Sequence, residues 1–85
     1  MTELRETRIR RLRMRSMRRG IKEMDLILSA YAASSLAHMS TEQLDLYDAL
    51  LEENDQDLYQ WVTGQAATPP AFADLVGEIA QTFQN

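Results

Sequence analysis

The chain has 85 residues, the size of one small domain, which leaves no room for a second core or a large substrate cavity. It has no cysteine and one histidine, which excludes disulfides, thiol nucleophiles, zinc–thiolate sites and centres with several histidine ligands. The net charge of −4 divides along the chain, because all nine basic residues lie in 1–22 against only Glu3 and Glu6, while the other eleven acidic residues lie in 23–85.

The first predicted helix spans about 6–18 and carries most of the arginines. Gly20 is predicted to end it in the left-handed conformation, where a missing Cβ removes the steric penalty. The arginine side has three interpretations. It binds phosphate backbones through counterion release, it binds a protein partner, or it is a solvated face partly paired with the acidic residues of the same domain. The arginines that a helical wheel gathers within an arc of about 100° are Arg8, Arg11, Arg15, Arg18 and Arg19.

Two further helices are predicted over 21–38 and 40–53. The former has apolar residues on two faces, so we expect it at the centre of the fold with neighbours on both sides. Ser40, followed three residues later by Gln43, predicts a capping box at the start of the latter. The second apolar face of 21–38 consists of Leu26, Ala30, Ala33 and Ala37.

The last two predicted helices are short. One spans 56–63, with Asp55 as its N-cap and Gly64 as its stop, and the other begins after a cap at Thr68 and a proline at Pro69. Together these patterns predict an all-α fold, in which 1–85 is a single domain built as a small bundle of about five short helices. The apolar stripe of the last helix is Phe72, Leu75, Val76, Ile79 and Phe83.

The sequence contains no convincing pattern for catalysis or for binding a metal. A calcium loop counted from Asp55 fails, because its sixth and twelfth positions are Gln60 and Ala66. No glycine-rich phosphate loop and no Ser-His-Asp set can be assembled. We therefore predict no catalytic residue, no metal site and no tightly bound cofactor. No apolar run reaches the roughly 20 residues of a membrane span, and a cytoplasmic location is expected.

The charge changes sign at the five residues 19–23, which read Arg-Gly-Ile-Lys-Glu. These residues have a good structural explanation. Gly20 can end a helix, Arg19 lies near the negative end of that helix, and Glu23 lies at the positive end of the next one. Taken alone, the pattern favours a structural role over a functional one.

Two longer stretches resemble a known family. Residues 18–28 contain an RG-x-x-E motif followed by an acidic and aliphatic helix, and residues 50–61 contain a leucine pair and then D-x-D-L-aromatic-x-W. Together they resemble the succinate dehydrogenase assembly factor 2 family, the SdhE-type FAD assembly factors. The resemblance covers most of residues 15–63.

The resemblance implies a helical, monomeric assembly factor that is not an enzyme. It would bind the flavoprotein subunit of succinate dehydrogenase, and also that of fumarate reductase, and promote covalent attachment of FAD to the client, which forms the bond itself. No membrane or nucleic-acid partner is expected. The alternative is a small Arg-rich helical nucleic-acid-binding or regulatory module. The motif implies a charged partner-binding surface formed by Arg19, Gly20 and Glu23 at an exposed helix junction, flanked by Arg18, Lys22 and Asp25.

Overall fold

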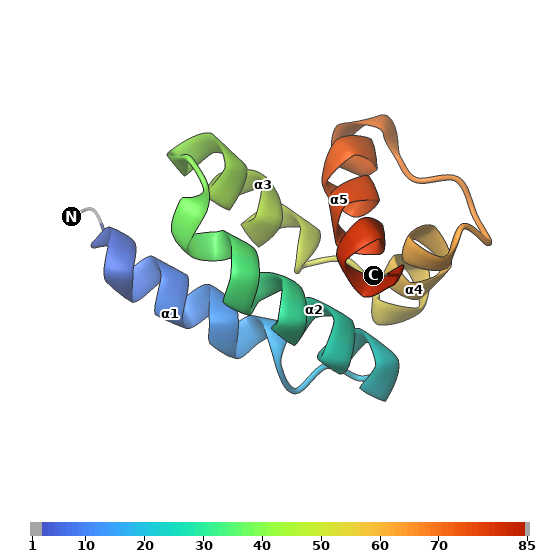
Figure 1. Ribbon diagram of the computed structural model, residues 1–85, viewed down its shortest axis with the longest axis horizontal. Helices are drawn as coiled ribbons and strands as arrows, with labels where there is room; N and C mark the ends of the chain where they lie inside the picture. The colour runs from blue at the N-terminus through green and yellow to red at the C-terminus, as the bar shows by residue number, and fades with distance from the viewer. Residues whose placement is uncertain (1–2, 85) are drawn as a thin grey trace.

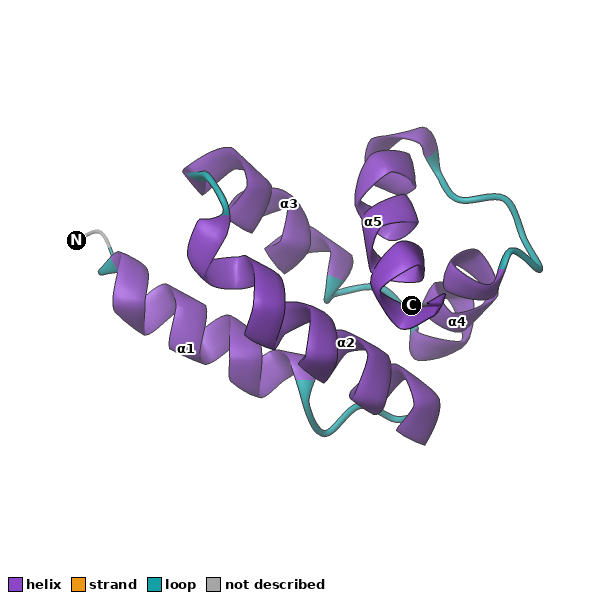
Figure 2. Cartoon of the chain, in the orientation of Figure 1, coloured by secondary structure: helices purple, strands orange, loops and turns teal. Residues whose placement is uncertain are grey.

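The computed structural model describes residues 3–84, and within them the chain is entirely helical apart from turns and loops. Figure 2 shows these loops, the widest of which joins α4 to the last helix of the chain. The predicted all-α class with five main helices is confirmed. The elements in chain order are α1 (Arg5–Ser16), α2 (Lys22–Ser35), η1 (Leu36–His38), α3 (Thr41–Leu50), α4 (Asp55–Thr63), η2 (Pro70–Phe72) and α5 (Ala73–Gln84).

Helix α2 lies at the centre of the fold, as its sequence predicted. It packs against α1 on one side and against α5 on another, and α4 contacts both α2 and α5 (Figure 1). Its buried residues include Ile27, Leu28 and Tyr31. The prediction of a second buried face was wrong. Leu26 is 65% exposed, and the other residues of that face, Ala30, Ala33 and Ala37, are exposed as well. Both neighbours therefore pack against one broad side of α2, and the opposite side is exposed.

One apolar core runs through all five helices. Helix α5 contributes Leu75, Val76 and Ile79, but Phe83 at the end of its predicted stripe is 52% exposed. Inside the core, the hydroxyl groups of Ser16 and Tyr47 are 2.6 Å apart, and Ser16 Oγ donates to the Leu12 carbonyl at 2.8 Å. Burial raises the pKa of Tyr47 to about 12, which keeps its hydroxyl protonated and able to donate.

Local signals placed some helix ends correctly. The capping box at Ser40 and Gln43 is present, and Gly64 ends α4 in the left-handed conformation with φ of 80°. The predicted N-cap of α4 was wrong: Asn54 caps it, with its side chain accepting from the Gln56 amide at 2.8 Å. Asp55 is then the first residue of α4 and its carboxylate is turned toward another part of the chain.

Other helix ends differ from the prediction. Helix α3 ends at Leu50, before the predicted end near Glu53, and η2 begins at Pro70 with Pro69 as its cap. Helix α1 ends at Ser16, and the left-handed residue after it is Arg18, with φ of 57°, and not Gly20. None of the helices in 3–84 is long and apolar enough to cross a membrane.

Candidate partner-binding site at the α1–α2 junction

Arg19 lies in the turn between α1 and α2 and holds three segments together. Its Nε donates to Asp55 Oδ1 at 2.8 Å, and its Nη2 lies 2.7 Å from the same oxygen. Its remaining N–H groups donate to the carbonyls of Arg15 and Leu51 at 3.2 Å and of Glu53 at 3.4 Å. The guanidinium thereby joins the last turn of α1 to the end of α3 and the start of α4. A planar fork of five donors suits this task in a way that a lysine ammonium does not.

The other oxygen of Asp55 binds the backbone of the same turn. Asp55 Oδ2 accepts from the amide of Gly20 at 2.5 Å and from that of Ile21 at 3.3 Å. A Cβ added at Gly20 would lie 3.3 Å from this oxygen, so the missing side chain allows the backbone to come close. Gly20 is therefore explained by close approach to a carboxylate and not by its predicted left-handed conformation.

The Arg19 and Asp55 side chains are each only 12% exposed, so they form a largely buried ion pair. The expectation that Arg19 displays its charge at an exposed junction is wrong, because its charge faces the domain's own carboxylate. Glu23 does match the expectation: it is exposed in the first turn of α2. A carboxylate at this position is stabilised by the positive end of the helix dipole.

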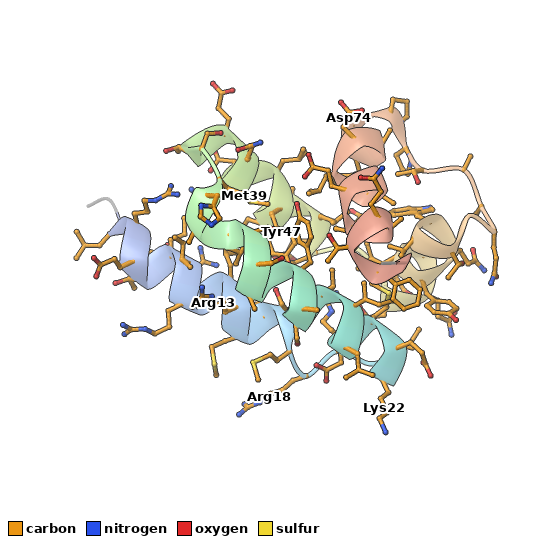
Figure 3. All side chains as sticks on the ribbon, in the orientation of Figure 1. Arg13, Arg18, Lys22, Met39, Tyr47 and Asp74 are labelled. Atoms are coloured by element: carbon orange, nitrogen blue, oxygen red, sulfur yellow. The ribbon has the colours of Figure 1, made fainter. Side chains whose placement is uncertain are left out.

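The flanking residues differ in their surroundings. Arg18 and Lys22 are exposed and project from the edge of the domain where α1 and α2 are joined (Figure 3). Asp25 is partly buried, and it accepts from the Arg18 amide at 3.1 Å and from the Ser29 hydroxyl at 3.3 Å. Asp25 therefore fixes the turn, while Lys22 and Glu23 are free to meet a partner.

A shallow hollow of about 490 Å³ lies beside this turn. One wall is the backbone of the α1–α2 turn and the other is the segment that leads into α4. The residues that line the hollow are Arg19, Gly20, Ile21, Glu53, Asn54, Asp55 and Gln56.

One side of α1 is neutralised by α3. Arg8 pairs with Asp45 at 2.5 Å, and Arg11 lies 3.3 Å from Asp48. Arg15 pairs with Asp48, and it also pairs at 2.8 Å with Glu52, which follows the end of α3. The interpretation of this face as partly paired with the domain's own acids is confirmed for these arginines. The basic residues Arg8, Arg11 and Arg15 and the acidic residues Asp45, Asp48 and Glu52 have the same spacing of three and then four.

The charges of this interface shift the pKa of Asp48. Burial raises that pKa, but hydrogen bonds from Arg11 and Arg15 and their positive charges outweigh burial, so the pKa lies below its usual value. Sequence reasoning missed the roles of both Asp48 and Asp55. For Asp48 the matched spacing on the two helices was a usable signal, whereas nothing local identified Asp55 as the partner of Arg19.

Comparison with known proteins adds an independent observation. The family described as "Flavinator of succinate dehydrogenase" matches residues 10–83, which include the whole junction and most of every helix. The chain belongs to this family. The resemblance to succinate dehydrogenase assembly factor 2 that the two sequence blocks indicated is thereby confirmed.

Individual relatives carry that name. The chain is 53% identical over 60 residues to "Succinate dehydrogenase assembly factor 2, mitochondrial" of Candida glabrata, covering 71% of this chain and 39% of the relative. It is 51% identical over 61 residues to the protein of the same name of Meyerozyma guilliermondii, covering 72% and 45%. It is 39% identical over 83 residues to "Succinate dehydrogenase assembly factor 2-A, mitochondrial" of Drosophila sechellia, covering 94% and 51%. The chain thus spans about half the length of these relatives or less.

The names of these relatives contradict the expected location. All three are called mitochondrial, whereas a cytoplasmic location was predicted for this chain. The prediction rested on the absence of a long apolar run and on interpreting the arginine-rich start as part of the fold and not as an organelle transit peptide. Neither argument tests the compartment directly, and the names of the relatives overturn the prediction.

Proposed function

We propose that this chain is an assembly factor that binds the flavoprotein subunit of succinate dehydrogenase and promotes covalent attachment of FAD to it. The observation that carries the proposal is the family match over residues 10–83, whose description is "Flavinator of succinate dehydrogenase". The names of the relatives, which are assembly factors of succinate dehydrogenase, agree with it.

In this proposal the chain acts on a client protein and is not itself an enzyme. The client holds the FAD and forms the bond, and the chain contributes by holding the reacting groups in a productive orientation. Fixing two groups at the right distance and angle removes much of the entropic part of a barrier. The flavoprotein subunit of fumarate reductase is a second client to test, and the chain is proposed to act as a monomer.

The motif residues have two different tasks in the proposed mechanism. Glu23 and Lys22 meet the client directly, because they are exposed on the first turn of the central helix. Arg19 and Gly20 act by position, since their contacts with Asp55 fix the turn that presents α2. Arg18 and Asp25 complete the same surface.

Flavin fluorescence of the denatured client in a gel tests the proposal. The assay uses a strain that lacks the chain, complemented with wild type, Glu23→Ala or Glu42→Ala. Glu42 is a matched control, because it is also an exposed glutamate in the first turn of a helix, in this case α3. We expect wild type and Glu42→Ala to restore fluorescence, and Glu23→Ala to lower it by about tenfold or more, the loss expected for an interface hot spot.

One result would contradict the proposed function, and another would contradict the role of Glu23. Normal fluorescence in the strain without the chain would show that succinate dehydrogenase does not need it. Full restoration by Glu23→Ala would remove Glu23 from the client-binding surface and leave the assembly role to other residues.

A further inference from the structure

Eight of the nine basic residues fall into two groups according to their contacts, and the ninth, Arg5, donates to the carbonyls of Ala37 and Met39. Arg8, Arg11, Arg15 and Arg19 each form an ion pair with a carboxylate of α3 or α4. Arg10, Arg13, Arg18 and Lys22 are exposed and form no ion pair with any residue in 3–84. The acidic helices therefore neutralise one side of α1 and leave the positive charge of the other side available.

The unpaired cations share their surface with exposed apolar side chains. Met14 is 49% exposed and Met17 is 46% exposed. Arg10, Arg13, Met14 and Met17 follow one another at intervals of three, one and three residues, which places them on one face of α1 and its C-cap. We call the set of Arg10, Arg13, Met14, Met17, Arg18 and Lys22 the free basic face.

The free basic face continues directly into the junction. In Figure 3, Arg18 and Lys22 project from the lower edge of the domain, where α1 passes into α2, and Arg13 lies on α1 farther toward the N-terminus. Lys22 is adjacent to Glu23, and Leu26, one turn further along α2, is 65% exposed. A partner that contacts Glu23 therefore lies next to this face.

We propose that the free basic face is a second part of the client-binding surface, and that it recognises a patch of carboxylates with apolar side chains among them on the flavoprotein subunit. This proposal rests on the proposed function. Arginine and methionine are both enriched in protein interfaces, and methionine adapts its shape to an uneven partner surface. Complementary charge steers encounter and orients the partners, which is the step that an assembly factor needs before alignment at Glu23.

Two other kinds of partner fit the face less well. A nucleic acid would bring phosphates close to Glu23 and Asp25, whose carboxylates repel them, and the face has no aromatic side chain on which a base could stack. A helix that lies in a membrane surface needs a broad apolar face, whereas Leu12 of α1 is turned into the core and two methionines remain outside.

Association kinetics with the purified flavoprotein subunit test the inference. The test variant is Arg10→Gln with Arg13→Gln. The control is Gln60→Glu with Gln81→Glu, which lowers the net charge by the same two units at exposed positions on α4 and α5. We expect the test variant to associate about tenfold more slowly at about 50 mM salt, with a smaller difference at about 300 mM, while the control matches wild type.

A second variant addresses the methionines without changing charge. Met14→Ser with Met17→Ser should speed dissociation several-fold and leave the salt dependence of association unchanged, because it removes apolar contact only. Circular dichroism of each variant confirms that the helices are intact. Binding of every variant to a DNA duplex of about 30 base pairs and to vesicles that contain anionic lipid is measured as well.

The outcomes separate this inference from the proposed function. If wild type fails to bind the flavoprotein subunit, the proposed function fails and the inference fails with it. If wild type binds and the arginine variant associates at the same rate, only the inference is overturned. Binding of the face to the duplex or to the vesicles, with client binding unaffected by its substitution, would overturn it as well.

Discussion

Breaking the ion pair between Arg19 and Asp55 should loosen the α1–α2 junction without removing the exposed carboxylate of Glu23. Each side chain of the pair is 12% exposed, so removal of one partner leaves a largely buried charge without its counter-ion. Such losses cost about 3–5 kcal/mol in the free energy of unfolding. A domain of this size has about 4–13 kcal/mol in total, so Arg19→Ala alone removes a large share of it.

The pairwise part of this cost can be isolated by a double-mutant cycle. Arg19→Ala, Asp55→Ala and the double variant are unfolded in urea and their free energies of unfolding compared. Because either single change already removes the shared contacts, we expect the double variant to cost about 2 kcal/mol less than the sum of the single changes. Values that add to within about 0.5 kcal/mol would refute the coupling that the geometry indicates.

A second cycle on the surface provides the matched control. Arg8 and Asp45 are also an arginine and an aspartate in contact, but the Asp45 side chain is 64% exposed. Water screens this pair, so its coupling should be below about 1 kcal/mol. If both pairs couple equally, burial is not the reason for the strength of the pair at the junction.

In the flavin assay, Asp55→Ala and Arg19→Ala should both lower fluorescence, because both changes displace the turn that leads into Glu23.

Two further predictions concern the core and the α1–α3 interface. Ser16→Ala should lower the free energy of unfolding by about 2 kcal/mol, because it leaves the buried Tyr47 hydroxyl without an acceptor. Tyr47→Phe should lower it by about 1 kcal/mol, and urea unfolding of both variants shows whether the serine change costs more. Asp48 has a pKa that is lower in the folded state than in the unfolded state, so its stabilising effect is present above the unfolded pKa of about 3.9 and is lost as the pH falls through the folded value. Asp48→Asn should therefore lower stability at about pH 7 and make it less sensitive to acid, and an unchanged slope between about pH 3 and pH 5 would contradict this.

The features that sequence reasoning predicted correctly depend on neighbouring residues. The capping box at Ser40 and Gln43 is closed within four residues, and the left-handed stop at Gly64 needs only the missing Cβ. The capping and stop signals are sufficient because no distant part of the chain competes with them. The central position of α2 was also predicted correctly, but from two apolar faces of which only one is buried.

The features that it missed are decided by contacts far apart in the chain. Helix α1 was expected to continue to Arg18, but it ends at Ser16, whose hydroxyl lies against Tyr47 in the core. Asp55 was predicted to cap α4, but Asn54 caps that helix while Asp55 binds Arg19 and Gly20. The resemblance assigned a functional role to the motif, which stays a prediction, and it could not show that the arginine of the motif is buried, because its partner lies 36 residues away.

The contacts of Asp55 also link the function of the junction to the completeness of the fold. The turn that precedes Glu23 is held by the start of α4, so the proposed client-binding surface would exist only in chains whose second half has already docked on the first. A partly folded chain would have the motif in its sequence but not the surface. By mass action, a client that binds only the complete form must in turn stabilise it. Each protein would then support the other's maturation: the factor favours the flavinylated client, and the client favours the folded factor.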